Sequence, residues 1–355
     1  MIVLSGVLEM GTRSKGFLQQ FRQLGCPDFV SCSSIGEELT GILIWDNMKW
    51  LYFVLGFTLL GCQQAERKTM REDRHIAIEP ELKLWVETFG EKGQEACLLI
   101  SGAGANSSFW SDRLCQQLVE RGFYVIKYDH RDFGYSTKID WDEDPYDFMQ
   151  LAKDALALLD ELGVNQAHVV GHSMGGFIVQ LMGIHFPDRI LSMTSISSST
   201  SSPTVPPPPK ETWDIFLSNH PQNNFEKDLA GFMKVWDYLN GTADFDEELA
   251  VAYTKNLYER QAIDGALGAT HVKAQETLTD RTEALATVNI PTLVMHGEED
   301  YAVDKYGAVQ TAASIPNAEL VLIPKMGHLP FNHEILASFE NEIISFITKN
   351  RLGED

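Results

Sequence analysis

From about residue 75 onward, short apolar runs alternate with segments whose apolar residues recur at helical spacing. This alternation predicts an α/β fold in which a mostly parallel sheet carries helices on both faces. The predicted strands are the apolar runs Leu82–Thr88, Cys97–Ile100, Tyr124–Tyr128, His168–Val170, Ile190–Ile196, Thr292–Met295 and Leu320–Ile323. The predicted helices are Asp112–Glu120, Tyr146–Leu162, Met174–His185 and Ile335–Lys349.

The alternation stops between about residues 200 and 285, where helical patterns follow one another without strands. Pro206–Pro209 predicts a stiff, extended exit from the sheet. One helix is indicated by apolar residues at i, i+3, i+4 and i+7, namely Leu229, Phe232, Met233 and Trp236, and a second by Asp246–Arg260. We therefore expect an α/β core from 75–202 and 286–355, with a helical cap inserted at 203–285. The apolar stripe of the cap either packs on the core or lines a substrate cleft.

The segment from Met48 to Cys62 has the pattern of a secretory signal. Lys49 supplies a positive charge, an apolar run of about a dozen residues follows, and Leu59-Leu60-Gly61-Cys62 ends it. The run is too short to span a bilayer, and its end looks like a lipoprotein cleavage site that leaves Cys62 to carry lipid. A short buried helix or an uncleaved anchor is the alternative, and without a signal the protein would be cytoplasmic.

This interpretation divides the amino-terminal part of the chain into three pieces. Residues 1–47 are an upstream extension if translation starts at Met48, residues 48–61 are the signal peptide, and residues 62–74 are a polar tether. The expected location is the bacterial cell envelope, with the membrane as a partner through lipidated Cys62.

Composition narrows the choice of partners. The formal net charge of −22 opposes binding to phosphates and argues against nucleic acid. Apolar residues make up 44% of the chain, which is enough for a sizeable core. The five cysteines form no CxxC pair and no metal-ligand spacing, so neither a disulfide framework nor a metal site is indicated. The composition gives no indication of the oligomeric state.

The strongest local signal is Gly171-His172-Ser173-Met174-Gly175, a G-x-S-x-G sequence between a predicted strand and a predicted helix. In this context the serine sits on a sharp, strained turn, and the glycines allow neighbouring backbone to come close. The following helix directs its positive end toward charge that develops at the serine. A glycine-rich turn with a capping serine would be the ordinary explanation for such a motif standing alone.

A candidate acid and a candidate base follow the serine in the order Ser, Asp, His that a serine nucleophile in this motif requires. Asp300 comes just after the predicted strand Thr292–Met295, and His328 comes just after Leu320–Ile323. The carboxyl ends of parallel strands meet at one sheet edge, so we expect Ser173, Asp300 and His328 to lie together. The imidazole would take the serine proton while the carboxylate fixes its tautomer. Glu299 or Asp304 as the acid, and His333 as the base, are lower-ranked alternatives.

An oxyanion hole needs two backbone N–H groups that point at the carbonyl oxygen as it becomes charged. We expect one from Met174, which follows the serine. We expect the other from Ala103, in the small-residue segment Ser101–Ala105. An ordinary glycine turn would explain that segment equally well.

Over residues 78–350 the sequence resembles the α/β-hydrolase superfamily. Asp129-His130-Arg131-Asp132-Phe133-Gly134-Tyr135-Ser136 is similar to the family stretch D-x-R-G-x-G-x-S, with Asp132 in place of the first glycine, and Ser101-Gly102 stands where many members have His-Gly. The Ser-Met-Gly-Gly elbow resembles the branch that contains aclacinomycin methylesterase and related esterases and lipases. The resemblance implies a carboxylic-ester substrate, no cofactor, Ser173 as nucleophile, Asp300 as acid, His328 as base, and Ala103 and Met174 as oxyanion donors.

Three functions remain open from the sequence. The first is hydrolysis of a small-molecule ester through an acyl-enzyme. The second uses the same three residues to cleave a C–C bond of a dienoic diketone, as some relatives with the same elbow do. The third is a surface-binding lipoprotein that keeps the fold without turnover.

Overall fold

The computed structural model describes residues 71–353, apart from residues 220, 223 and 261–268. Eight strands form one sheet in the order β1-β2-β4-β3-β5-β6-β7-β8. The strands are β1 (Arg71–Ala77), β2 (Lys83–Phe89), β3 (Glu95–Ile100), β4 (Phe123–Tyr128), β5 (Ala167–His172), β6 (Ile190–Ile196), β7 (Thr292–Gly297) and β8 (Glu319–Ile323). The ladders from β4 through β8 are parallel, whereas β2 pairs antiparallel with both β1 and β4. The predicted mostly parallel α/β sheet is thus confirmed.

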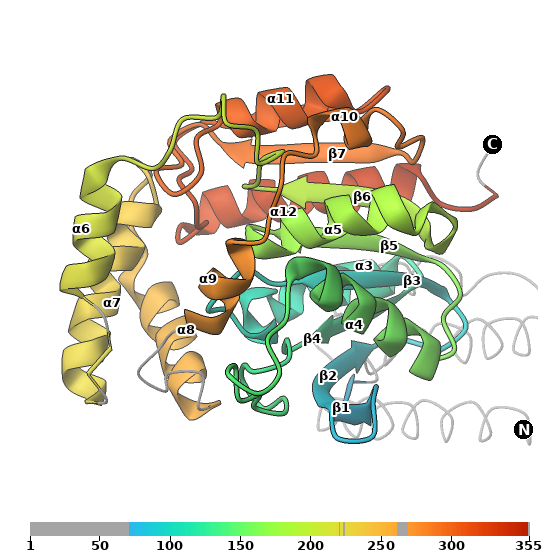
Figure 1. Cartoon of the computed structure of the whole chain (residues 1–355), viewed down its shortest axis with the longest axis horizontal. Coiled ribbons are helices and arrows are strands. Elements are labelled where there is room, and N and C mark those ends of the chain that lie inside the picture. Colours follow the sequence, from blue (N-terminus) through green and yellow to red (C-terminus); the bar gives the residue numbers. More distant parts are fainter. Residues whose placement is uncertain (1–70, 220, 223, 261–268, 354–355) are drawn as a thin grey trace, which may run out of the picture. The chain divides into compact units, whose positions relative to one another are not determined.

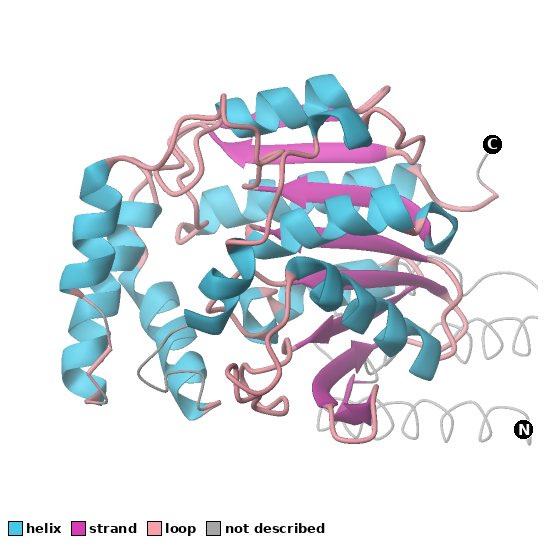
Figure 2. Ribbon diagram, in the orientation of Figure 1, coloured by secondary structure: helices cyan, strands magenta, loops and turns pink. Residues whose placement is uncertain are grey.

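Helices cover both faces of this sheet (Figures 1 and 2). The described helices are α3 (Asp112–Glu120), α4 (Phe148–Glu161), α5 (Met174–His185), α6 (Lys210–Ser218), α7 (Phe225–Leu239), α8 (Glu247–Glu259), α9 (Ala269–Gln275), α10 (Thr282–Leu285), α11 (Tyr306–Ser314) and α12 (His333–Lys349). Side-chain caps mark the start of several helices: Ser111 accepts from the Leu114 N–H, and Asp147 accepts from the Gln150 N–H.

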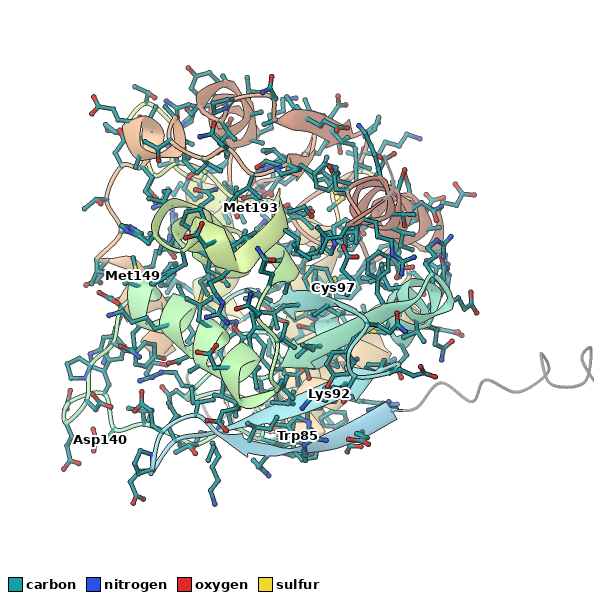
Figure 3. All side chains as sticks on the ribbon, turned by 90° about the vertical axis from the view of Figure 1, so that its right-hand side faces the viewer. Trp85, Lys92, Cys97, Asp140, Met149 and Met193 are labelled. Carbon is teal, nitrogen blue, oxygen red and sulfur yellow. The ribbon has the colours of Figure 1, made fainter. Side chains whose placement is uncertain are left out.

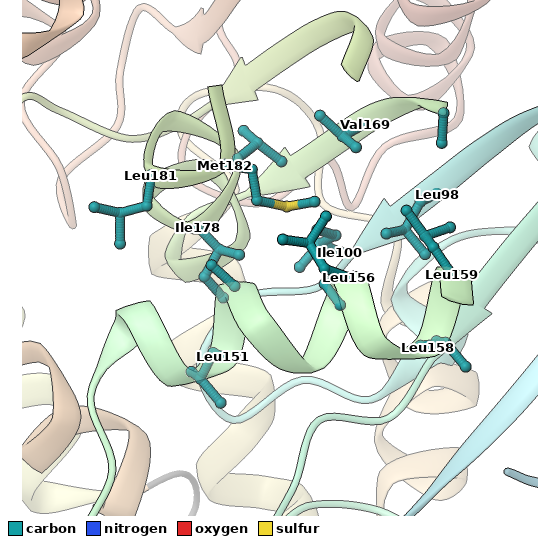
Figure 4. Packing of buried hydrophobic residues seen from close by; sticks show 14 of the residues in the cluster. Leu98, Ile100, Leu151, Leu156, Leu158, Leu159, Val169, Ile178, Leu181 and Met182 are labelled. Atoms are coloured by element: carbon teal, nitrogen blue, oxygen red, sulfur yellow. The ribbon is translucent and has the colours of Figure 1, made fainter. Parts of the chain in front are cut away.

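The core has two layers because the central strands are buried on both faces. One layer joins the sheet to α4 and α5, and Figure 4 shows Leu156 and Leu159 of α4 beside Ile100 and Leu98 of β3. The other layer joins the opposite face to α3 and α12 and includes Cys97. Figure 3 shows Cys97 well inside the domain and the exposed Asp140 at its periphery. Such a core holds the strand ends, and the loops that follow them, in fixed positions.

Helices α6 to α9 follow β6 as an insertion and lie beyond the arrowheads of the parallel strands (Figure 2). Helix α10 instead packs beside α11 and α5. The predicted cap boundary at residue 285 is therefore one short helix too late. Backbone and side-chain bonds join the two ends of the insertion, because Arg281 N–H donates to the Thr200 carbonyl at 2.9 Å and Thr282 bonds the Thr200 hydroxyl.

The tether predicted for residues 62–74 is wrong at its end, since Arg71–Arg74 belong to strand β1. This edge strand is exposed along almost its whole length, so no apolar alternation reveals it. Its backbone pairs with β2 from Arg71 to Ala77, and the guanidinium of Arg71 lies 2.8 Å from the buried carboxylate of Glu87. In the described residues no helix has the length and apolar character that a membrane crossing needs. The signal, the extension and Cys62 lie outside the described residues.

Candidate active site

Ser173 sits on the sharp turn between β5 and α5. Its backbone angles are φ 54° and ψ −117°, a conformation that residues other than glycine rarely adopt. The turn is possible because Gly171 lacks a side chain: a Cβ there would lie 2.0 Å from the carbonyl oxygen of Gly175. The strained turn projects Ser173 from the carboxyl edge of the sheet at the amino end of α5, as the motif predicts.

The side chains of Ser173, His328 and Asp300 form a hydrogen-bonded line. The Nε2 atom of His328 lies 3.0 Å from the Ser173 hydroxyl, and its Nδ1 lies 2.8 Å from Oδ2 of Asp300. These residues follow β5, β8 and β7 respectively, and the three strands end at the same edge. The structure therefore brings together the three residues that the sequence predicts to meet. Such geometry allows the imidazole to accept the hydroxyl proton.

Asp300 is held as a carboxylate. Its Oδ1 accepts from the N–H groups of Ala302 and Val303, both at 2.8 Å, and its side chain is fully buried. Burial alone would raise the pKa of Asp300, but the neighbouring His328 and His296 hold it well below its usual range. Because an ionised Asp300 can only accept, it fixes the His328 proton on Nδ1 and leaves Nε2 free to accept from Ser173.

His296 is a neighbour of Asp300 that the sequence analysis missed. It lies four residues earlier on β7, and its Nε2 is 3.2 Å from Oδ2 of Asp300 and 2.8 Å from the Val303 carbonyl oxygen. An N–H shared between these two acceptors steadies Oδ2 of the carboxylate, whereas the backbone donors hold Oδ1. The sequence signal was a polar residue at a central strand end, which gives no direction for its ring.

The lower-ranked alternatives have other partners. Glu299 accepts from the Thr242 N–H at 2.7 Å, and Asp304 accepts from the Tyr306 N–H at 2.8 Å. His333 pairs with Asp246 at 2.8 Å, and its side chain is 77% exposed. Asp300 and His328, in contrast, bond each other and Ser173.

The two expected oxyanion donors belong to segments next to Ser173: Met174 follows it in the chain, and Ala103 lies in the turn after β3. Met174 begins α5, so no carbonyl within that helix can accept its N–H. Ala103 lies in the turn after β3, in which Ala105 N–H donates to the Gly102 carbonyl at 3.3 Å. A Cβ on Gly102 would lie only 3.1 Å from the Cβ of Ser173, so this turn passes directly beside the serine.

Asp132, which replaces a family glycine, adopts a φ of 67°. Left-handed backbone explains why glycine is common at this position, and aspartate tolerates it better than most residues. The carboxylate accepts from the Ile139 N–H at 3.1 Å and thereby closes the loop that the motif forms.

A buried ionic network supports the segment that follows the Ala103 turn. Ser107 donates its N–H to Asp129 and its hydroxyl to Glu87, both at 2.8 Å. The guanidinium of Arg260, at the end of α8, lies 2.7 Å from Glu87. The network thus joins the cap to the sheet beside the candidate site. Across the described residues, no group of three or more His, Cys, Asp or Glu side chains is arranged to hold a metal ion.

The sheet, the insertion and the serine turn define the class as an α/β-hydrolase-fold hydrolase. The profile of the Abhydrolase_1 family, described as alpha/beta hydrolase fold, matches residues 96–333. The chain belongs to this family.

Curated relatives cover most of the chain. Rhodomycin D methylesterase DauP of Streptomyces sp. (strain C5) is 32% identical over 285 residues, which span 73% of this chain and 93% of the relative. The 2-hydroxy-6-oxononadienedioate/2-hydroxy-6-oxononatrienedioate hydrolase 1 of Pseudomonas putida is 26% identical over 288 residues, or 80% of this chain and 98% of the relative. The predicted resemblance to the methylesterase branch is confirmed.

Solved structures agree on the fold. A hydrolase from Pseudomonas aeruginosa PA01 superposes with a TM-score of 0.60 at 27% identity and covers 78% of this chain and 98% of its own. A membrane phospholipase A, described as a bacterial virulence factor, gives a TM-score of 0.66 at 20% identity, with 86% and 95% covered. At this lower identity the likeness concerns the fold alone.

Proposed function

We propose that the protein hydrolyses a carboxylic ester of a small molecule through an acyl-enzyme, with Ser173 as nucleophile, His328 as base and Asp300 as the acid that orients it. The observation that carries the proposal is the line of hydrogen bonds from Ser173 through His328 to Asp300. The methylesterase relative, at 32% identity, supports the ester as substrate class.

In the first half of the reaction, Ser173 attacks the ester carbonyl carbon as His328 takes its proton. The carbonyl oxygen becomes an oxyanion, and the N–H groups of Ala103 and Met174 stabilise it. Asp300 stabilises the imidazolium that forms at His328. His328 then gives its proton to the departing alcohol, and the acyl group remains on Ser173.

In the second half, His328 takes a proton from water, and the resulting hydroxide attacks the acyl carbon. The tetrahedral intermediate collapses, the acid leaves, and the proton returns to Ser173. Neither half requires a cofactor, because the serine, the imidazole and the backbone donors supply all the groups involved.

The test is hydrolysis of a panel of p-nitrophenyl and methyl esters of graded acyl length. Ser173→Ala is expected to lower kcat by about 10⁴-fold, since the residual rate comes only from binding and the oxyanion donors. Ser314→Ala, at a partly buried serine of α11 whose hydroxyl bonds the Gln310 carbonyl of the same helix, serves as the matched control and should leave kcat unchanged. Near-normal ester hydrolysis by Ser173→Ala would refute the assignment.

C–C bond hydrolysis is the second candidate, and the Pseudomonas putida relative favours it at 26% identity. The same three residues would serve, with a carbon leaving group in place of an alcohol. Turnover of a dienoic ring-fission product in the absence of p-nitrophenyl ester hydrolysis would select this candidate. A non-catalytic binding lipoprotein would turn over neither substrate and would leave Ser173 unreactive toward a fluorophosphonate.

For the location we propose a bacterial envelope lipoprotein that is anchored through lipid on Cys62. The support is the sequence pattern from Met48 to Cys62, which is typical of a lipoprotein signal. Two or more acyl chains on Cys62 would hold the protein durably on a membrane. Cys62→Ser is expected to move the protein from the membrane fraction to the soluble fraction. A native mature chain that begins before residue 62, measured by intact mass, would contradict the proposal.

A further inference from the structure

His172, the residue immediately before Ser173, makes a direct contact with the backbone of the base. Its side chain is buried, with 2% of its surface exposed, and its Nε2 lies 2.8 Å from the carbonyl oxygen of His328. A carbonyl oxygen can only accept, so His172 carries its proton on Nε2 and donates it.

The His172 ring is held in one orientation by its neighbours. It stacks on Phe109, with ring centroids 4.5 Å apart and an interplanar angle of 28°. Its Nδ1 faces the turn after β3, where a Cβ on Gly102 would come within 3.5 Å. The ring therefore fills the space between this turn and the base, and a donor on Nε2 points only toward His328.

His172 also keeps its donor over the working pH range. Burial, followed by the nearby His328, lowers the pKa of His172 to about 3. A neutral ring keeps the same Nε2–H and adds no second positive charge beside the imidazolium that forms at His328 during the reaction.

The loop that carries the base is held from two directions. On one side, Gly327 and Leu329 donate their N–H groups to the carbonyl oxygens of Asn240 and Leu239, at the end of cap helix α7, at 2.9 and 3.0 Å. On the other side, the carbonyl of His328 itself accepts from His172. The cap therefore bonds the residues on either side of His328, whereas the turn that carries Ser173 bonds His328 itself through His172.

We propose that His172 is a positioning residue that ties the backbone of His328 to the turn that carries Ser173. His172 and Ser173 are consecutive, so a displacement of the elbow carries both partners of the Ser173–His328 hydrogen bond together. Asp300 orients the ring of the base, and His172 fixes the point from which that ring extends. The inference depends on the proposed function, because it concerns the same three residues.

The experiment compares His172→Phe with His172→Gln in ester hydrolysis. Phenylalanine keeps the stack on Phe109 but cannot donate, whereas the glutamine amide can donate from near the Nε2 position. We expect His172→Phe to lower kcat by about 10- to 100-fold with KM within about two-fold, because a small displacement of the base is costly. His172→Gln should recover kcat to within about five-fold of the wild type.

His168→Phe is the matched control. His168 lies on the same strand, is fully buried and bonds Ser192 at 2.7 Å, but it occupies the opposite end of β5. This variant should lower the melting temperature and leave kcat unchanged. A loss of kcat in the control equal to that of His172→Phe would overturn the positioning role, since general destabilisation would then explain both.

The inference also fails if folded His172→Phe keeps a kcat within about two-fold of the wild type, or if His172→Gln is impaired as strongly as His172→Phe. If His172→Phe does not fold, His172→Gln decides: recovery within about five-fold supports the proposal and a larger loss refutes it. Activity of Ser173→Ala would instead refute the proposed function, so the two failures are distinguishable.

Discussion

Replacing Glu87 by glutamine should expose how much the buried ionic network contributes to stability. The carboxylate of Glu87 is fully buried and lies 2.7 Å from Arg260, 2.8 Å from Arg71 and 3.5 Å from Lys127. Glutamine keeps the shape of the side chain but removes its charge. It therefore leaves two buried cations, Arg260 and Lys127, with less compensation.

The pKa of Glu87 sets the size of the effect. Burial would raise this pKa, but Lys127, Arg260 and Ser107 together lower it from 4.5 to about 2. Each pKa unit corresponds to ~1.4 kcal/mol, so the ionised carboxylate contributes about 3 kcal/mol to the free energy of unfolding. Because the native pKa lies below the unfolded value, this contribution is complete above pH 4.5 and is lost as the pH falls toward 2.

The assay is urea unfolding of the wild type and Glu87→Gln, followed by tryptophan fluorescence from pH 7.5 down to pH 3. At pH 7.5 we expect the variant to be less stable by about 3 kcal/mol, and the difference should narrow below pH 4.5 as the unfolded wild type takes up the proton. Glu143→Gln, the same change at an exposed position, should cost less than about 0.5 kcal/mol. A difference that is the same at every pH would refute the reasoning.

Three further predictions concern Asp300, Arg281 and the two buried cysteines. Asp300→Asn should lower kcat by about 10⁴-fold with an intact fold, because an amide no longer fixes the tautomer of His328. Ester kinetics measures the loss and circular dichroism checks the fold. A loss of kcat below ten-fold would contradict the prediction. Arg281→Lys should lower the free energy of unfolding by about 2 kcal/mol, since lysine cannot replace the guanidinium bonds to Gln180 and the Ser199 carbonyl. Urea unfolding measures this difference, and an unchanged midpoint would count against the prediction. Burial raises the pKa of the Cys115 thiol to about 12, and that of Cys97 even further, so neither thiol should be alkylated by iodoacetamide in the folded protein. Peptide mapping before and after denaturation checks this. Rapid labelling of either cysteine in the native protein would contradict the prediction.

The sheet could be predicted largely from the sequence because its central strands are apolar on both faces. Helices α3 and α5 begin and end at the predicted residues, since Ser111 caps the start of α3 and the G-x-S-x-G turn sets the start of the apolar helix α5. Strand β1 could not be predicted in this way. It is an exposed edge strand that depends on backbone bonds to β2 and on the ion pair between Arg71 and Glu87. Helix α11 also lacked a signal, because small residues fill much of it.

The residues of the candidate site also differ in whether the sequence predicts them. Ser173, Asp300 and His328 could be predicted because chain order and strand ends alone bring them to one edge. The contacts of His172 and His296 could not, because each depends on where a ring nitrogen points. Glu87 lies in a predicted strand, yet its three cationic partners come from positions 71, 127 and 260, and no local pattern links those positions.

Covalent labelling of Ser173 tests the central claim most directly. The purified protein is treated with a fluorophosphonate while ester hydrolysis is followed, and the adduct is then located by peptide mass spectrometry. The account predicts one adduct per chain, on Ser173, with activity lost in proportion to labelling and no adduct on Ser173→Ala. Ester hydrolysis that persists with Ser173 fully labelled, or an inactivating adduct on another residue, would contradict it.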